Sequence, residues 1–263
     1  MRHFVLCPAI TILLLAAAST GARSQESQSP VACGTDSPDA CLRDGDAFEQ
    51  QSAAGSIERA VAAYRTGCDA GSSESCHRLG TMLRDGRGIS PDGIRAAVVY
   101  ARGCDLGSGG ACTERGRLFR AGRQVDPDVV VAGRLFRRGC DLGDARGCSE
   151  LGELYLSGEG VIGNPPAALQ NFQRGCDGAW ATACTRAGRL LESGNDVGQD
   201  LRRAAALYQR GCDLYDPVSC GKLGSMYQDG RGVTEDRKRA DALFARACSL
   251  DIYHRCQDVF QFH

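Results

Sequence analysis

A pair of cysteines eight residues apart recurs along the chain, and this regularity limits the possible folds more than any other feature. The first cysteines of successive pairs stand 36 residues apart, except that the N-terminal interval is 35. The pairs are Cys33/Cys41, Cys68/Cys76, Cys104/Cys112, Cys140/Cys148, Cys176/Cys184, Cys212/Cys220 and Cys248/Cys256. A fixed period of roughly 20 to 50 residues is the signature of a solenoid built from repeated units.

One helix is predicted to follow the second cysteine of each pair. Apolar residues stand three, six and seven positions after it, as in Leu79, Met82 and Leu83, and this spacing follows one face of a helix. A glycine recurs four positions after the cysteine: Gly45, Gly80, Gly116, Gly152, Gly188 and Gly224. Because glycine inside a helix costs about 1 kcal/mol relative to alanine, its repetition predicts a close backbone approach to a neighbouring helix.

A second helix is predicted before the first cysteine of each pair. Alanine stands eight residues before that cysteine and an aromatic residue four before it, as in Ala132 and Phe136, so a small and a large side chain share one face. Ser90-Pro91 and Asp126-Pro127 predict starts of this helix, with a capping side chain before a proline at the first position. We expect it to end at the glycine directly before the cysteine. These glycines are Gly67, Gly103, Gly139, Gly175 and Gly211.

The predicted unit is therefore a helix, a glycine-rich turn, a second helix and a short turn bracketed by cysteines. The sequence predicts an all-α solenoid of six such units, forming one repeat domain over residues 33–263. The expected units are 33–68, 69–104, 105–140, 141–176, 177–212 and 213–248, followed by a capping helix within 249–263.

The N-terminal residues 1–22 have the pattern of a secretory signal peptide. Arg2 precedes an apolar run from Ala9 to Ala18, and small residues follow at Thr20-Gly21-Ala22. We expect residues 23–32 to form a flexible tail. Cys7 would leave with the signal, and the remaining 14 cysteines are an even number, which is typical of disulfides in a secreted or periplasmic protein.

Two disulfide registers are possible for these cysteines. A bridge can lie within each eight-residue pair, or it can close a unit on itself, as Cys76 with Cys104. The first register pairs all 14 cysteines, whereas the second leaves Cys33 and Cys256 alone. We therefore predict seven bridges, one within each of the pairs given above.

Composition argues against several classes of function. The net charge of -1 gives no electrostatic support for binding nucleic acid or an anionic membrane. No later segment is long and apolar enough to cross a bilayer. Only His77, His254 and His263 remain after the signal, and no C-x-x-C occurs, so neither a metal site nor a cofactor is predicted. We expect a monomer.

The repeated motif L-G-x-L-Y…G-x-G-V…A…Y/F-x-R-G-C-D-L-G resembles the Sel-one-like repeat (SLR) family, relatives of the tetratricopeptide repeats, over residues 33–256. The cysteine spacing is similar to that of the Helicobacter cysteine-rich proteins. The resemblance implies a right-handed α/α superhelix whose concave face is lined by the first helix of each unit. It also implies possible activities, since penicillin binding and weak β-lactamase activity have been assigned to members, and others are discussed as host- or envelope-interacting proteins.

A serine β-lactamase needs a serine activated by a lysine, usually in the motif S-x-x-K. The chain has one such motif, Ser219-Cys220-Gly221-Lys222. The plainer interpretation is stronger, because both residues occupy positions that vary among the units and that we expect on an exposed helix edge. The partner motifs S-D-N and K-T-G are absent. Ser219 and Lys222 are therefore weak catalytic candidates, and the sequence favours a protein that is not an enzyme.

Polar residues recur one, two and five positions after the second cysteine, and the resemblance directs them toward the concave groove. The ligand-binding candidates among them are Arg78, Glu114, Glu150, Arg186 and Lys222. Their mixed charge suits a peptide, a protein or a peptidoglycan fragment. A merely solvated helix face explains the same residues equally well.

Two residues depart from the repeat pattern and are further ligand-binding candidates. Arg115 stands where most units have an apolar residue, so it is either a groove arginine or a local packing irregularity. Trp180, the only tryptophan, lies in a cysteine-bracketed turn. It is either an anchor for a partner or a ring packed over its own disulfide.

The sequence thus favours an exported disulfide-rich scaffold that binds a peptide, a protein or a cell-wall-derived ligand on its concave face. The alternative, by resemblance, is a penicillin-binding, weakly β-lactamase-like hydrolase, for which β-lactams would be the ligands. A third possibility is an envelope assembly factor.

Overall fold

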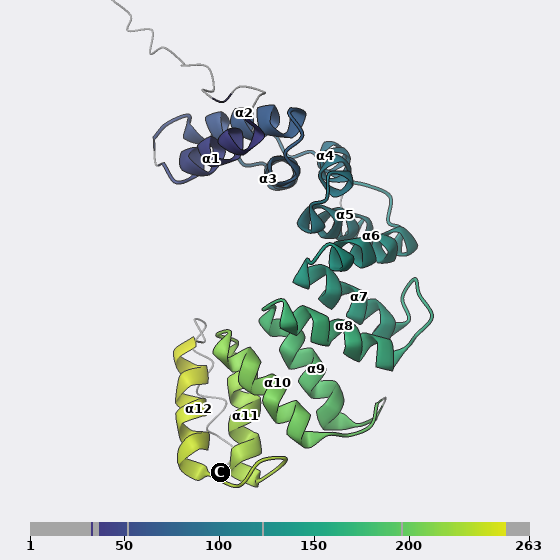
Figure 1. The fold of residues 1–263 in the computed structure, drawn as a ribbon, viewed down its shortest axis with the longest axis vertical. Coiled ribbons are helices and arrows are strands. Elements are labelled where there is room, and N and C mark those ends of the chain that lie inside the picture. Colours follow the sequence, from purple (N-terminus) through teal and green to yellow (C-terminus); the bar gives the residue numbers. More distant parts are fainter. Residues whose placement is uncertain (1–32, 34–36, 52, 123, 196, 251–263) are drawn as a thin grey trace, which may run out of the picture. The chain divides into compact units, whose positions relative to one another are not determined.

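Each predicted unit is a pair of helices in the computed structural model, which describes residues 33, 37–51, 53–122, 124–195 and 197–250 (Figure 1). The first helices of the units are α1 (Pro38–Glu49), α3 (Ser73–Asp85), α5 (Gly109–Ala121), α7 (Ala145–Ser157), α9 (Ala181–Ser193) and α11 (Pro217–Asp229). The second helices are α2 (Ser56–Asp69), α4 (Gly93–Asp105), α6 (Val129–Asp141), α8 (Pro165–Asp177), α10 (Leu201–Asp213) and α12 (Arg237–Leu250). The described residues contain no strand, so the all-α prediction is confirmed. The predicted signal, tail and capping helix lie outside them.

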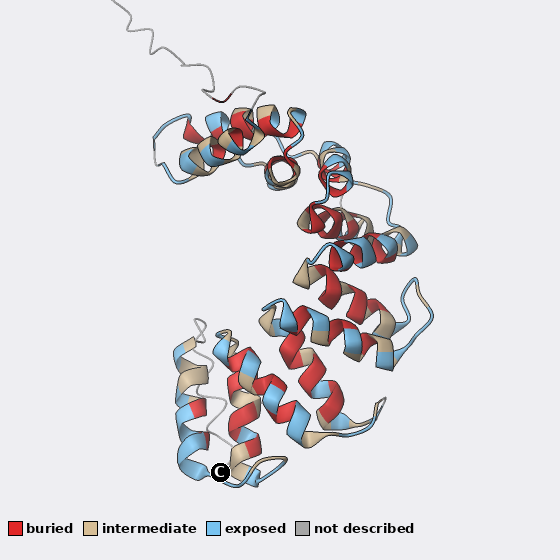
Figure 2. Ribbon diagram, viewed as in Figure 1, coloured by how far each residue is buried: buried red, intermediate tan, exposed pale blue. Residues whose placement is uncertain are grey.

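Each helix packs against the next one along the chain, and buried residues gather where successive helices face each other (Figure 2). The first helices also contact one another at every step, from α1 with α3 to α9 with α11. Among the described second helices, only α8 and α10 share a contact of similar extent. The first helices therefore form a continuous layer, here called the first-helix layer, and the second helices form the second-helix layer.

The recurring glycine of the first helix makes room for the aromatic ring of the second helix. A Cβ atom placed on Gly152 would lie 2.7 Å from the ring of Phe172, which is fully buried. The same relation joins Gly80 to Tyr100 and Gly188 to Tyr208. A close approach was predicted correctly, but the approaching group is a side chain rather than the backbone of a neighbour.

The second helices from α2 to α10 do not end at the glycine before the cysteine, as predicted, but continue to the aspartate after it. Gly103, for example, lies inside α4, and a Cβ atom there would be 2.9 Å from the Cβ of Ala111 on α5. This glycine is required where the second helix crosses the first helix of the next unit. Its role is close packing, so it does not mark the helix end.

The predicted starts of two second helices are also wrong, by two residues. The N-caps of α4 and α6 are Asp92 and Asp128, whose carboxylates each accept a hydrogen bond of 2.8 Å from a backbone N–H in the first turn. Pro91 instead packs over Gly86, where a Cβ would lie 3.0 Å from the proline Cδ. Asp216 caps the first helix α11 in the same way, since its carboxylate accepts a bond of 2.9 Å from the N–H of Ser219.

Six of the seven predicted disulfides are formed in the structure. They are Cys33–Cys41, Cys68–Cys76, Cys104–Cys112, Cys140–Cys148, Cys176–Cys184 and Cys212–Cys220. Each joins the end of one unit to the first helix of the next, except the first, which ties Cys33 to α1. The seventh stays a prediction because Cys256 lies outside the described residues. Within the described part of the chain, no helix is long and apolar enough to cross a membrane.

Candidate functional site

The predicted ligand-binding residues two positions after the second cysteine, here called position +2, all lie in the first-helix layer and all form ion pairs with the preceding first helix. Glu150 lies 2.9 Å from Arg120, and Lys222 lies 3.5 Å from Glu192. The remaining pairs are Arg78 with Asp46, Glu114 with Arg84, and Arg186 with Glu153. These side chains therefore hold adjacent units together, which the prediction of a ligand contact or a solvated face did not include.

Glu114 is the centre of one such network. The residue is 7 % exposed, and its carboxylate contacts Arg84 on α3, Arg117 on its own helix at 3.1 Å, and Arg146 on α7 at 2.9 Å. Burying a carboxylate costs free energy of desolvation, which is offset when charged donors surround the group, as they do here. The network links three successive first helices in one place.

A cavity of about 280 Å³ opens beside this network in the first-helix layer. Its lining includes Arg84, Asp85, Glu114 and Arg117. Arg84 donates to both carboxylate oxygens of Asp85, at 2.7 and 2.9 Å, and these bonds hold the pKa of Asp85 below its ordinary value. The cavity thus presents fixed donors and acceptors of both charge signs, as a binding site for a polar ligand requires.

A second acidic centre in the same layer is Glu192 on α9. Its carboxylate accepts a bond of 2.7 Å from the hydroxyl of Tyr208 and lies 3.5 Å from Lys222 and 3.2 Å from Arg231. Burial raises the pKa of Glu192 less than the tyrosine hydrogen bond and the two cations together lower it, so the pKa lies below its ordinary value. The carboxylate of Glu192 therefore serves to hold neighbouring helices together.

Arg115 and Trp180 are partly buried rather than freely exposed. The guanidinium of Arg115 lies 5.5 Å from the ring centre of Phe119, and its buried Nε has no hydrogen-bond partner among the described residues. Trp180 occupies the N-cap position of α9, packs at the edge of the core and carries Arg146 over its ring at 4.6 Å. Packing therefore accounts for much of both side chains.

The serine of the S-x-x-K motif is inaccessible. Ser219 is 0 % exposed, not on an exposed helix edge as expected, and its hydroxyl is hydrogen-bonded to Thr185 of the preceding first helix. Lys222 points its ammonium group at Glu192 instead. A nucleophile must reach its substrate, so this pair does not form a catalytic site in this structure.

The second-helix layer carries a ladder of ion pairs that sequence reasoning missed. From Cys104 onward, the arginine two residues before the first cysteine of a pair reaches the aspartate that ends the preceding second helix, as Arg138 reaches Asp105 at 3.0 Å. The other pairs are Arg102 with Asp69, Arg174 with Asp141, Arg210 with Asp177 and Arg246 with Asp213. The arginines of α6, α8 and α10 also donate to a carbonyl near that helix end. The recurrence of R-G-C-D at a fixed period was the available signal.

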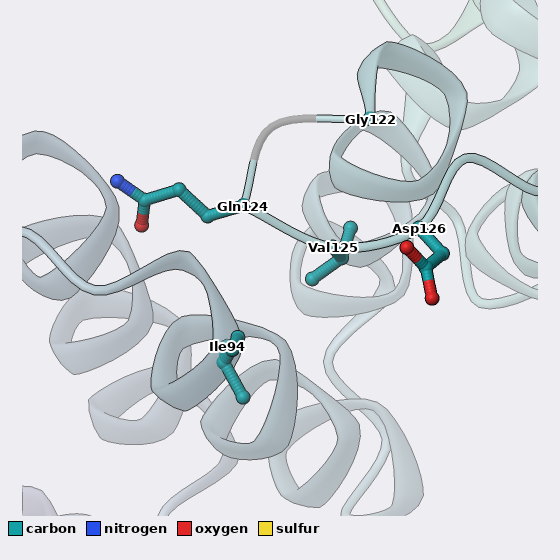
Figure 3. Close-up of a pocket in the computed structure, with 5 residues that line it drawn as sticks. All are labelled: Ile94, Gly122, Gln124, Val125 and Asp126. Atoms are coloured by element: carbon teal, nitrogen blue, oxygen red, sulfur yellow. The ribbon is translucent and has the colours of Figure 1, made fainter.

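A larger cavity, of about 510 Å³, lies where the loop after α5 passes the start of α4 (Figure 3). Figure 3 shows Val125 on the side of the loop that faces the helix of Ile94, while the side chains of Gln124 and Asp126 diverge from the loop. The side chain of Gln124 accepts a hydrogen bond from the N–H of Gly93. The described residues of the lining hold one carboxylate and one amide, and the described part of the chain contains no cluster suited to a metal ion.

The sequence model of the family described as Sel1 repeat matches residues 73–108, 110–144, 145–179, 181–216 and 217–252, which together cover more than half of the chain. The matched segments correspond to the helix pairs from α3–α4 to α11–α12. No curated protein matches the sequence.

Solved structures with the same fold come from several bacteria. The chain is similar to c5321, a protective antigen of uropathogenic Escherichia coli strains, with a TM-score of 0.72 and 22% identity over 81% of this chain and 46% of that one. It thus spans about half of that protein's length. A Sel1 repeat protein from Oxalobacter formigenes has a TM-score of 0.67 and 22% identity over 80% and 82% of the two chains. Cysteine-rich protein B of Helicobacter pylori is 30% identical over 48% of this chain and 90% of that one, with a TM-score of 0.39.

Proposed function

The chain belongs to the Sel1 repeat family, and from this premise we propose that it is an exported scaffold that binds a peptide or protein partner across its first-helix layer. Repeats of this kind serve as interaction modules because stacked helices present one extended surface. The observation that carries the proposal is the cavity beside Glu114, where charged groups of both signs are already fixed before a ligand arrives. Such preorganisation lowers the entropic cost of binding.

Export is supported by the signal-like residues 1–22 and by the six disulfides. Disulfides persist in oxidising compartments and are rare in the cytosol. A partner in the periplasm or outside the cell follows from this location. A short peptide that carries both carboxylate and ammonium groups, such as a peptidoglycan stem peptide, matches the mixed charge of the cavity.

The test is calorimetric titration of the mature protein with a synthetic stem tetrapeptide, using Arg117→Ala and Arg189→Ala as a matched pair. Both arginines stand five positions after the second cysteine and are exposed, but only Arg117 lines the cavity. We expect Arg117→Ala to weaken binding about fivefold or more and Arg189→Ala to leave it unchanged. Absence of binding, or equal binding by both variants, contradicts the proposed site.

A further inference from the structure

A groove in the second-helix layer lacks a ring that other units of the same chain possess. It lies between α2 and α4 and encloses about 240 Å³ over Leu79 and Leu83 of α3. Arg65 and Arg95 line it from the two second helices, and Val98 forms part of its wall. The groove is on the layer opposite to the surface proposed above.

The repeat itself shows what usually fills this place. Seven positions after the second cysteine, most units carry an aromatic residue on the first helix: Phe48, Phe119, Tyr155 and Tyr227. Leu83 and Leu191 are the exceptions. Arginines of the second helices hold several of these rings. Arg59 lies 4.0 Å from the ring centre of Phe48 and Arg239 4.4 Å from that of Tyr227, while Arg137 donates a bond of 2.7 Å to the hydroxyl of Tyr155.

Arg95 stands at the same repeat position as Arg59 and Arg239, and Arg65 stands at the position of Arg137. In this unit the ring they would hold is replaced by Leu83. Among the described residues, neither guanidinium has an ion pair, a hydrogen bond or a ring contact. Asp69 and Arg102 also line the groove, and they are paired with each other at 3.2 Å. The groove therefore keeps two uncompensated positive charges over an apolar floor.

The other unit without a ring shows that the leucine alone does not create this arrangement. In the unit of Leu191, the position of Arg65 is occupied by Gln173. The remaining arginine there, Arg203, lies 4.0 Å from Asp200. That unit thus has no pair of unpartnered arginines, and it supplies a control position.

The surface beside the groove is apolar and exposed. Ile94 and Val98, one helical turn apart on α4, are 64% and 67% exposed. We propose that the groove binds an aromatic side chain of an acidic peptide segment in a partner protein. The ring would occupy the space that Tyr155 and Tyr227 fill elsewhere, and neighbouring carboxylates would pair with Arg65 and Arg95. A cation over a ring and a charge-assisted hydrogen bond both gain strength in such a partly desolvated place.

Fluorescence anisotropy with a labelled nine-residue glutamate peptide that has one central tyrosine tests the proposal. The decisive variant is Leu83→Tyr, which supplies the missing ring from within. Its control is Leu191→Tyr, the same change at the same repeat position without the orphaned arginines. A double variant, Arg65→Gln with Arg95→Gln, removes the charges without altering the buried floor. Circular dichroism verifies that each variant is folded.

We expect Leu83→Tyr and the double arginine variant each to weaken binding about tenfold or more, and Leu191→Tyr to match the wild type. Replacing the central tyrosine of the peptide with leucine should weaken binding about fivefold. The proposal is wrong if the wild-type protein shows no saturable binding of the tyrosine peptide, if Leu83→Tyr binds as tightly as wild type, or if a lysine peptide with the same tyrosine binds equally well.

Discussion

At the scale of single residues, Glu114 is a nearly buried carboxylate shared by three arginines from three helices. Replacement by glutamine would leave the guanidinium groups of Arg84, Arg117 and Arg146 close together without a counter-charge. We expect Glu114→Gln to lower the free energy of unfolding by about 2 kcal/mol, less than for a fully buried pair because the arginines are partly exposed. Urea denaturation measures this difference.

Glu159→Gln is the matched control for this change. Glu159 is exposed and pairs with one arginine, Arg120, at 3.2 Å. Its loss should cost no more than about 0.5 kcal/mol. If the two substitutions lowered the free energy of unfolding equally, the burial of Glu114 would not be the reason for its contribution to stability.

Three buried tyrosines limit the stability of the folded protein at alkaline pH. Burial, aided by acceptor carboxylates, raises the pKa of Tyr64 and Tyr208, and burial raises the pKa of Tyr100 to about 12. A pKa raised in the folded state means that the unfolded chain releases its proton first. The stability that these hydroxyls contribute is therefore complete below the ordinary tyrosine pKa of 10.0 and is lost as the pH rises through the raised pKa of the folded state.

We expect the urea midpoint to fall as the pH rises from about 10 to about 12. Tyr208→Phe, which keeps the buried ring but removes the hydroxyl, should make this fall shallower. In a difference titration of wild type against Tyr208→Phe, the tyrosinate absorbance of Tyr208 should appear together with unfolding rather than before it. An unchanged pH dependence in Tyr208→Phe would contradict the assignment.

At the scale of the helix, one glycine position can be tested against another with the same substitution. A Cβ at Gly152 would meet the buried ring of Phe172 at 2.7 Å, whereas a Cβ at Gly221 on α11 would meet nothing within 4 Å. We expect Gly152→Ala to destabilise by about 2 kcal/mol, because the enclosed ring cannot move away. Gly221→Ala should stabilise by up to about 1 kcal/mol through helix propensity. Thermal unfolding of both variants would reveal opposite shifts, and shifts of the same sign would refute this packing argument.

The disulfides belong to the same scale, since five of the six that the structure describes tie two helices at a junction. Each closes a short loop, worth about 2.5 kcal/mol in the chain-entropy model. Non-reducing digestion and mass spectrometry of the mature protein should yield only bridges within the eight-residue pairs, including the predicted Cys248–Cys256. Free thiols or longer-range pairs would contradict the stapled junction.

Sequence reasoning predicted the helix pairs, their period and the disulfide register because each leaves a periodic trace. It misplaced the helix ends at Gly103 and Gly139, because a glycine that permits close packing has the same sequence pattern as one that ends a helix. It could not assign the charged residues at position +2, such as Glu150, whose partner lies 30 residues earlier on another helix. The groove of Leu83 was missed because its signal is an absent aromatic residue.

At the scale of the molecule, each unit contacts chiefly its neighbours, so stability is close to a sum of unit and junction terms. The junctions are reinforced on both sides. The first-helix layer contributes the position +2 ion pairs and the second-helix layer contributes the arginine ladder, while a disulfide crosses between successive units. The two layers are chemically different, and this permits one protein to present two distinct binding surfaces.

The ion pairs of the first-helix layer also restrict how the gene can grow or shrink by recombination between its repeats. Copying residues 105–140 in tandem would place Arg120 beside a second Glu114, so the new joint would have opposite charges. Deleting residues 105–176 would bring Arg84 against Arg186, two like charges at a joint that now carries Arg84 with Glu114. Repeats with the same cysteine spacing are therefore not interchangeable, because the charges on their first helices must match those of the preceding unit. Duplication or deletion of repeats preserves the ion pair at some joints and brings like charges together at others.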